Sequence, residues 1–130
     1  TAATQLRGLW IQGGNADASF SSPHCRGGGI RCINGASPTI INCVIRRNTA
    51  SLTGGGIDAE SGSPEILSCR ILDNHAGSAA SGYGGGAVVG GGTIDDCTFS
   101  RNSANSASAS GGALVGGSMT VTLSLKPLVK

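Results

Sequence analysis

Aromatic residues, charges and long apolar runs are all scarce in this chain. Of its 130 residues, 3% are aromatic and 12% are charged, and lysine occurs only near the C-terminus, as Lys126 and Lys130. The formal net charge is +2, and no basic stripe is visible in the sequence that would follow a phosphate backbone. No apolar run approaches the roughly 18 residues needed to cross a bilayer. We therefore expect no nucleic-acid partner and no membrane span.

Glycine, in contrast, is abundant. It accounts for 23 of the 130 residues, or about 18%, against a usual share of ~7%. This content disfavours long helices, and the glycines lack the every-third spacing of collagen. Because apolar residues (38%) are spread along the whole chain, we expect one folded domain without long helices.

Two motifs recur in phase along the chain. One is a glycine run followed by an aliphatic residue, and its last glycine recurs at intervals of 27, 30 and 26 residues (Gly29, Gly56, Gly86, Gly112). The other has the form Ile-x-x-Cys-x-Ile/Phe-x-x-Asn, and a weaker copy of it spans residues 9–16. Its clear copies are Ile40-Cys43-Ile45-Asn48, Ile66-Cys69-Ile71-Asn74 and Ile94-Cys97-Phe99-Asn102. These motifs divide the chain into repeats of about 6–26, 27–53, 54–83, 84–109 and 110–125.

Each repeat contains short stretches of alternating apolar and polar residues, separated by turns rich in Gly, Ser, Asn and Pro. A unit of about 27 residues made of short strands cannot bury a face alone and has to stack on its neighbours. The Leu-x-x-Leu-x-Leu pattern of leucine-rich repeats is missing. We therefore predict an all-β fold, a right-handed parallel β-helix of four to five coils in a single domain over residues 1–130. The predicted handedness follows the rule for parallel crossovers.

Coils stacked at the strand spacing of about 4.8 Å place equivalent residues above one another. The inward columns predicted in this way are all apolar, which supports the register. They are Ile30/Ile57/Ala87/Ala113, Cys32/Ala59/Val89/Val115, Ile40/Ile66/Ile94, Cys43/Cys69/Cys97 and Ile45/Ile71/Phe99.

The two motifs also carry a resemblance. The Gly-Gly-Gly-Ile runs and Phe99-Ser100-Arg101-Asn102 resemble the GGAI and FxxN repeats of chlamydial polymorphic outer membrane proteins. Residues 6–115 as a whole resemble the parallel β-helix repeats of bacterial surface proteins, which share their fold with pectate lyases. The resemblance implies secretion, adhesion or envelope structure on the one hand, and polysaccharide binding or cleavage on the other. Ile45 and Ile71 depart from the FxxN pattern, which has Phe at their position.

Asn48, Asn74 and Asn102 fall at one corner of successive coils. Their amides can bond to the backbone and to each other there, as side-chain ladders do in stacked strands, so we interpret them as structural. The inward cysteines are expected to have Cβ atoms near the spacing of about 4.8 Å, beyond the ~3.5–4.5 Å of a disulfide. We predict a column of buried free thiols, formed by Cys43, Cys69 and Cys97.

The other two cysteines leave two alternatives open. Cys25 lies in the loop before a glycine run and Cys32 points inward, so either a Cys25–Cys32 bridge or two free thiols fit the sequence. His24 beside Cys25 makes no familiar zinc spacing, and His75 is the only other histidine. We predict no metal site and no cofactor.

The carboxylates form no clear acid–base pair in the sequence. Arg47, Asp73 and Arg101 are expected in one outward column, where opposite charges face each other across adjacent strands. Asp95 and Asp96 are adjacent, and in an extended strand they point to opposite faces unless a turn intervenes. We therefore predict no catalytic residue. The alternative is a pectate-lyase-like fragment that binds or cleaves polysaccharide.

The segments after each ladder asparagine would all emerge on one face, the usual place for binding in repeat proteins. Phe20 and Tyr83 are the only aromatic residues in these segments. Two readings stay open for them, a ligand face that binds sugar and plain surface loops.

One more strand is indicated near the C-terminus by the alternation of Met119, Thr120, Val121, Thr122 and Leu123. We expect this strand to add to the sheet of a neighbouring copy and so to join coil ends into a homo-oligomer or fibre. A chain cut from a longer β-helix is the other explanation, and the start at Thr1 without Met or a signal segment fits a processed protein or such a piece. The sequence favours a non-enzymatic, structural or adhesive module, extracellular or at the cell surface.

Overall fold

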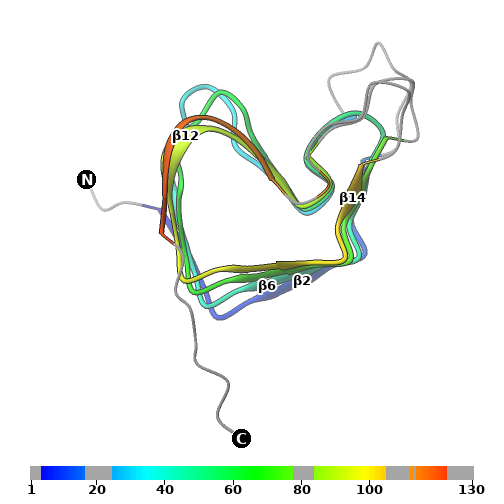
Figure 1. The fold of residues 1–130 in the computed structure, drawn as a ribbon, viewed down its shortest axis with the longest axis horizontal. Helices are drawn as coiled ribbons and strands as arrows, with labels where there is room; N and C mark the ends of the chain where they lie inside the picture. Colours follow the sequence, from blue (N-terminus) through cyan, green and yellow to red (C-terminus); the bar gives the residue numbers. More distant parts are fainter. Residues whose placement is uncertain (1–3, 17–24, 78–83, 105–111, 113, 123–130) are drawn as a thin grey trace, which may run out of the picture.

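A computed structural model describes residues 4–16, 25–77, 84–104, 112 and 114–122 of the chain, with side chains described as far as residue 114. The chain winds into a parallel β-helix, seen end-on in Figure 1, where successive coils lie one behind another. Every regular element in the described ranges is a β-strand, and all strand pairs are parallel. The predicted all-β solenoid is thus confirmed. The same ranges hold no helix of the length and apolarity needed to cross a lipid bilayer.

Three sheets run along the stack. The first sheet has seven strands, β1 (Gln5–Arg7), β4 (Ile30–Arg31), β5 (Thr39–Ile41), β8 (Ile57–Ala59), β9 (Glu65–Leu67), β12 (Ala87–Asp95) and β15 (Leu114–Thr122). The second sheet has four, β2 (Trp10–Gln12), β6 (Val44–Arg46), β10 (Arg70–Leu72) and β13 (Thr98–Ser100). The third sheet has β3 (Asn15–Ala16), β7 (Thr49–Ala50), β11 (His75–Ala76) and β14 (Ser103–Ala104).

Single residues with positive φ turn the chain from one sheet to the next. Between the first and second sheets these are Gly8, Asn42, Ser68 and Asp96, and between the second and third they are Gly13, Arg47, Asp73 and Arg101. A residue with a side chain pays roughly 1–2 kcal/mol in this left-handed conformation, so the strands on either side have to hold it there. The repetition of the two corners in every coil keeps the three sheets in line.

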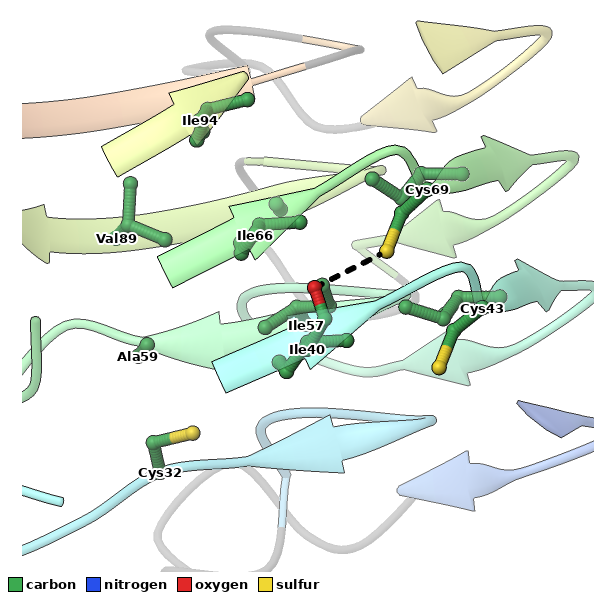
Figure 2. Close-up of a cluster of buried hydrophobic side chains, with 12 residues drawn as sticks. Cys32, Ile40, Cys43, Ile57, Ala59, Ile66, Cys69, Val89 and Ile94 are labelled. Carbon is green, nitrogen blue, oxygen red and sulfur yellow. Dashed lines mark hydrogen bonds between the residues drawn. The ribbon is translucent and has the colours of Figure 1, made fainter. Parts of the chain in front are cut away.

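The core lies inside the coils and is formed by the middle residue of most strands. Ile40, Ile45, Ile57, Ile66 and Ile71 are completely buried. Figure 2 shows Ile40, Ile66 and Ile94 on successive coils, in the column that the sequence predicts.

The last coil differs from the prediction by one residue. Ala87 pairs with Leu114 and Val89 with Gly116, so the predicted inward positions Ala113 and Val115 are wrong by one step. Leu114 packs against the core. A one-residue slip exchanges the inward and outward faces of a strand, and placing the larger Leu114 inside buries more apolar surface than Ala113 would.

The glycine runs lie where the cross-section is indented. In Figure 1 the ribbon dips toward the middle of the coil, between the side labelled β14 and the side labelled β12. Added Cβ atoms at Gly28, Gly55 and Gly85 would lie 2.2–2.4 Å from a carbonyl oxygen of the third sheet. Only glycine lets the backbones approach so closely.

Candidate functional site

The three repeated asparagines form one hydrogen-bonded ladder. The Nδ2 of Asn48 donates to the Oδ1 of Asn74 at 3.0 Å, and the Nδ2 of Asn74 donates to the Oδ1 of Asn102 at 3.0 Å. Each amide also donates to a backbone carbonyl of the preceding coil, at 2.8–3.1 Å. Asn48 and Asn74 are almost fully buried, and the ladder satisfies their polar atoms. Because the fold supplies a hydrogen-bond partner to the polar atoms of these buried amides, the asparagines have no amide atom available for catalysis.

The ladder explains why the two sequence motifs run in phase. A Cβ atom on Gly29 would lie 2.8 Å from the Nδ2 of Asn48, and one on Gly56 would lie 3.0 Å from the Nδ2 of Asn74. In these two runs the third glycine therefore packs directly on the asparagine of its own repeat. The glycine and asparagine motifs form one structural unit.

The inward cysteines form a column of free thiols just after the corner between the first and second sheets. Each thiol donates to two backbone carbonyls at 3.3–3.5 Å, one in its own coil and one in the coil before. Figure 2 shows one of these bonds, from Cys69 to the carbonyl of Ile40. Cys43 and Cys69 are buried, whereas Cys97 is partly exposed. These thiols fill space and satisfy carbonyls, as weak donors in a core do.

Cys97 is the most reactive member of the column. The hydrogen bond from Cys69 lowers the pKa of Cys97 to about 7, and the same contact, together with burial, raises the pKa of Cys69. Because the thiolate is the nucleophile, partial exposure and a lowered pKa both favour modification of Cys97 over the others.

Of the two alternatives for Cys25 and Cys32, the structure has two free thiols. Both are buried. Burial, followed by the charge of Asp58, raises the pKa of Cys32 and keeps it protonated. Across the described ranges, no group of three or more His, Cys, Asp or Glu side chains lies close enough to hold a metal ion.

The carboxylates of the described residues are dispersed, and several have partners of their own. Asp73 accepts two hydrogen bonds from Arg101, at 2.7 and 3.0 Å, and this contact holds its pKa below the usual range. Asp96 accepts from the hydroxyl of Ser68 at 3.3 Å. Asp96 follows β12 and turns the chain, so a turn separates the two carboxylates and they do not share an extended strand.

Asp58 is a buried carboxylate that the sequence does not mark as such. It accepts from the hydroxyl of Thr53 and from the backbone N–H of Glu60, the latter at 3.1 Å. Glu60 in turn forms an ion pair with Arg26 of the preceding coil. These contacts tie the bend before β8 to the turn after it.

Apolar side chains gather at the N-terminal end of the described stack, where no further described strand covers them. Of the described residues, only Leu9 (45%), Trp10 (64%) and Ile33 (48%) are large hydrophobic side chains with high exposure, and all three belong to β2 or to the segments next to β1 and β4. A cavity of about 270 Å³ lies at the same end, and its lining includes Leu6 and Ile30. Within the described strands, β1, β2, β3 and β4 each pair with a neighbour on one side only.

The predicted tail strand lies at the opposite end of the stack. Met119, Thr120, Val121 and Thr122 belong to β15 and pair with Gly92–Asp95 of β12 in the same chain. One edge of this strand is therefore taken by its own chain, and only the other edge faces away from the stack. Leu123, and both Phe20 and Tyr83 of the predicted ligand face, lie outside the described residues.

Sequence reasoning missed two features that the fold assembles. The apolar N-terminal end was hidden because Leu6 and Ile30 look like ordinary core positions, and only the absence of a described coil beneath them leaves them partly exposed. The placement of Arg46 and Arg70 on neighbouring strands was missed because the two residues are far apart in sequence, although the repeat period that predicts the Arg47, Asp73 and Arg101 column could have shown it.

Comparison with known proteins addresses the fold directly. The family described as "Right handed beta helix region" matches residues 2–125. Searches of curated proteins and of solved structures gave no match. The narrower resemblances to chlamydial surface proteins and to pectate lyases thus stay predictions, whereas the predicted handedness agrees with the family and the parallel strands agree with its fold. This chain belongs to the right-handed β-helix family.

Proposed function

We propose that this chain is a non-enzymatic structural or adhesive module of the extracellular space or cell surface, and that copies of it associate end to end. The N-terminal end of the described stack carries the proposal. Its parallel strands each have one edge without a described partner, and the partly exposed core positions Leu6 and Ile30 lie there around a cavity of about 270 Å³.

A second copy of this chain is the occupant that fits this end. β15 closes the described stack at the other end and has an edge that pairs with no described strand. A parallel β-helix can continue across such a junction at the normal strand spacing, because every coil presents the same three strand directions. A head-to-tail contact of this kind does not close on itself and produces a filament.

The distribution of carboxylates favours a structural role over polysaccharide cleavage. Glycoside hydrolysis needs two carboxyl groups on opposite sides of one bond, and Ca²⁺-dependent cleavage needs a cluster of oxygen ligands. Asp58 is buried, Asp73 is held by Arg101, and Glu60 is held by Arg26. A carboxylate committed to such a partner is poorly placed to move a proton.

Electron microscopy and analytical ultracentrifugation of the full chain test the proposal. We expect filaments with an axial repeat of about 22–25 Å per copy, which corresponds to four and a half to five coils at about 4.8 Å each. Discrete monomers at all concentrations would overturn end-to-end association.

A charge at the open end should block the association. Leu9→Lys places an ammonium at a position that is already 45% exposed, so the fold tolerates it, but a stacked coil would have to bury it at high cost. Ser61→Lys adds the same charge to an exposed turn in the middle of the stack and serves as the matched control. We expect monomers for Leu9→Lys and filaments for Ser61→Lys. Filaments from both variants would place the contact elsewhere.

A further inference from the structure

The first sheet consists of two halves, and this makes both ends of the described stack stepped. One half contains β4, β8 and the first residues of β12 and β15, and the other contains β1, β5, β9 and the last residues of β12 and β15. At the N-terminal end β1, β2 and β3 reach one coil further than β4, so β4 has an edge without a described partner. The cavity of about 270 Å³ lies at this step and is lined by Leu6 of β1 and Ile30 of β4.

The C-terminal end of the described stack has the complementary shape. β15 continues both halves of the first sheet for one coil beyond β12, whereas β13 and β14 are the last described strands of the second and third sheets. This end therefore projects where β4 recedes, and it recedes where β2 and β3 project. Only one place is filled at both ends, because β1 and residues 120–122 of β15 belong to the same half of the first sheet.

We propose that two copies join by strand exchange, in which β1 of the second copy replaces residues 120–122 of β15 on β12 of the first. This inference rests on the end-to-end association proposed above and specifies its register. The first half of β15 stays in place and pairs with β4 of the second copy, while β2 and β3 of that copy pair with β13 and β14. Gly116 and Gly117 lie between the two halves of β15, where the chain has to leave the stack. The strand that the sequence predicts to join copies thus covers, in the free copy, the edge of β12 to which β1 binds.

The apolar columns of the core continue across this junction. The partly buried apolar residues that pack against the described core lie three at each end of the stack, Leu6, Ile11 and Ile30 at one and Cys97, Phe99 and Leu114 at the other. When the register of the stack is extended into the second copy, the inward pairs are Leu6 with Ile94, Leu9 with Cys97, Ile11 with Phe99 and Ile30 with Leu114. Exchange therefore buries all of these partly exposed positions, and their burial favours association.

An outward pair of opposite charges falls into the same register. Arg7 follows Leu6 on β1 and Asp95 follows Ile94 on β12, so exchange places Arg7 opposite Asp95. Neither residue forms an ion pair with another described residue. Within one copy Arg7 and Asp95 lie three coils apart, or about 14 Å, a separation at which salt screens exposed charges. This ion pair can form only between copies.

Addition of β1 to the outer edge of β15 is the alternative arrangement, and it pairs fewer strands. It moves the second copy one coil further along the stack. β2 and β3 of that copy would then lie two strand spacings from β13 and β14, and β4 would lie two spacings from β15. Of the two arrangements, only exchange gives every described strand edge of the stack a partner at the junction.

The axial repeat of the filament distinguishes the two arrangements. In exchange neighbouring copies share one coil, so each copy adds four coils or about 19 Å, whereas addition gives five coils or about 24 Å per copy. We expect about 19 Å from electron microscopy of the full chain. A repeat near 24 Å would overturn exchange but leave end-to-end association in place, because copies would still stack. The absence of filaments would overturn the association itself.

A charge swap tests the register in the full chain. Arg7→Glu and Asp95→Arg each place like charges opposite each other, and we expect each to raise the concentration needed for filament growth about fivefold in sedimentation experiments. The double variant Arg7→Glu/Asp95→Arg restores an opposite pair and should return to within about twofold of the wild type. Glu65→Arg makes the same change of charge one coil away from the junction and is the matched control. Equal effects of Glu65→Arg and Asp95→Arg, or no recovery in the double variant, would overturn the register.

Proline in the second half of β15 tests whether this segment has to leave. Thr120→Pro/Val121→Pro removes two successive N–H groups of β15 and weakens its pairing with β12. Under exchange the edge of β12 becomes easier to reach, so we expect filaments to form at a concentration at least about tenfold lower than for the wild type. Addition requires an intact β15, so it predicts that the same variant loses its filaments. That loss, with the circular dichroism of the remaining coils unchanged, would contradict strand exchange.

Discussion

The first coil and the third coil are built from the same pattern but differ in burial. In the third coil Ile71 is completely buried and Cys69 almost completely so, whereas in the first coil Ile11 is only half-buried and Leu9, at the position of Cys69, is 45% exposed. The two coils pair with their neighbours in the same register. The difference arises because the third coil has a described neighbour on both sides and the first coil on one.

The asparagine ladder shows the same difference. Asn74 bonds to Asn48 in the coil before it and to Asn102 in the coil after it. In the first coil Gly14 takes the corresponding place, and its backbone N–H donates to the Oδ1 of Asn48 at 2.9 Å. A side chain there would collide with the carbonyl of Gly28, so the ladder ends at Asn48. Stability in this fold is a property of neighbouring coils more than of any single one.

The largest loss of stability is expected from Gly55→Ala, which adds a methyl group in the middle of the stack. The added Cβ of Gly55→Ala would lie 2.4 Å from the carbonyl oxygen of His75 and 2.6 Å from that of Gly85, and both are backbone atoms that cannot move aside. We expect a loss of more than about 4 kcal/mol of unfolding free energy, the range of the most damaging single substitutions. Urea unfolding followed by circular dichroism measures it.

Gly8→Ala is the control in the first coil. No atom lies within 4 Å of its added Cβ, and only the positive φ of 66° is unfavourable. The cost should be about 1–2 kcal/mol. Similar losses for the two variants would show that φ, and not close packing, makes the glycine runs necessary.

Asn74→Ala should have the second largest effect. It leaves the backbone N–H and the Nδ2 of Asn48, together with the carbonyl of Ile45, without their partner inside the coil. Three orphaned groups at roughly 1–3 kcal/mol each predict a loss of about 3–4 kcal/mol after partial relaxation. Asn15→Ala, which changes an exposed residue of the first coil, should cost less than about 0.5 kcal/mol. A small loss for Asn74→Ala would mean that water enters the ladder.

The third comparison shortens an inward isoleucine at equivalent positions of the third and first coils. Ile71→Ala removes a completely buried side chain between two neighbours and should cost about 3 kcal/mol. In an unassociated copy Ile11→Ala should cost about half as much, because Ile11 is already half-exposed there and leaves a smaller cavity. If both variants were destabilised equally, the first coil would be covered in solution, as end-to-end association predicts. Repeating the pair in the Leu9→Lys background separates the two explanations.

The repeat period predicts most of this fold from sequence. Columns such as Ile40, Ile66 and Ile94 follow from alternation and from in-phase motifs, because each column must be apolar along its whole length. The register of β15 was wrong because Gly116 and Gly117 interrupt the alternation, which leaves Ala113 and Leu114 equally acceptable as the first inward residue. A register choice of this kind is made by packing against the previous coil.

The candidate sites were less predictable than the fold. The burial of Asp58 depends on how the bend before β8 folds over it, which no local pattern encodes. The placement of Arg46 and Arg70 on neighbouring strands becomes visible only once the register is known. The charge pattern along a solenoid sequence therefore does not show how many charges the fold places on one face.

The smallest effect on stability is expected from the contact between Asp73 and Arg101 on the outside of the stack. The hydrogen bonds from Arg101, followed by the charges of the neighbouring arginines, hold the pKa of Asp73 below its ordinary value. Because the folded pKa is lower than the unfolded one, the contact stabilises the fold fully above the ordinary Asp pKa of about 3.9, and this contribution is lost as the pH falls through the lowered pKa. Arg101→Ala should therefore unfold slightly more easily than the wild type at pH 7, with the difference vanishing near pH 2 and shrinking in high salt.

An NMR titration of the Asp73 carboxyl gives the direct measurement for this contact. Its midpoint should rise toward the ordinary value in Arg101→Ala and change less in Arg47→Ala, since Arg47 acts on Asp73 by charge alone. An equal rise in both variants would show that the summed charge of the neighbouring arginines, and not the paired hydrogen bonds of Arg101, sets the pKa of Asp73. In that case Arg46→Ala, which removes a third charge near Asp73, should raise the midpoint as well.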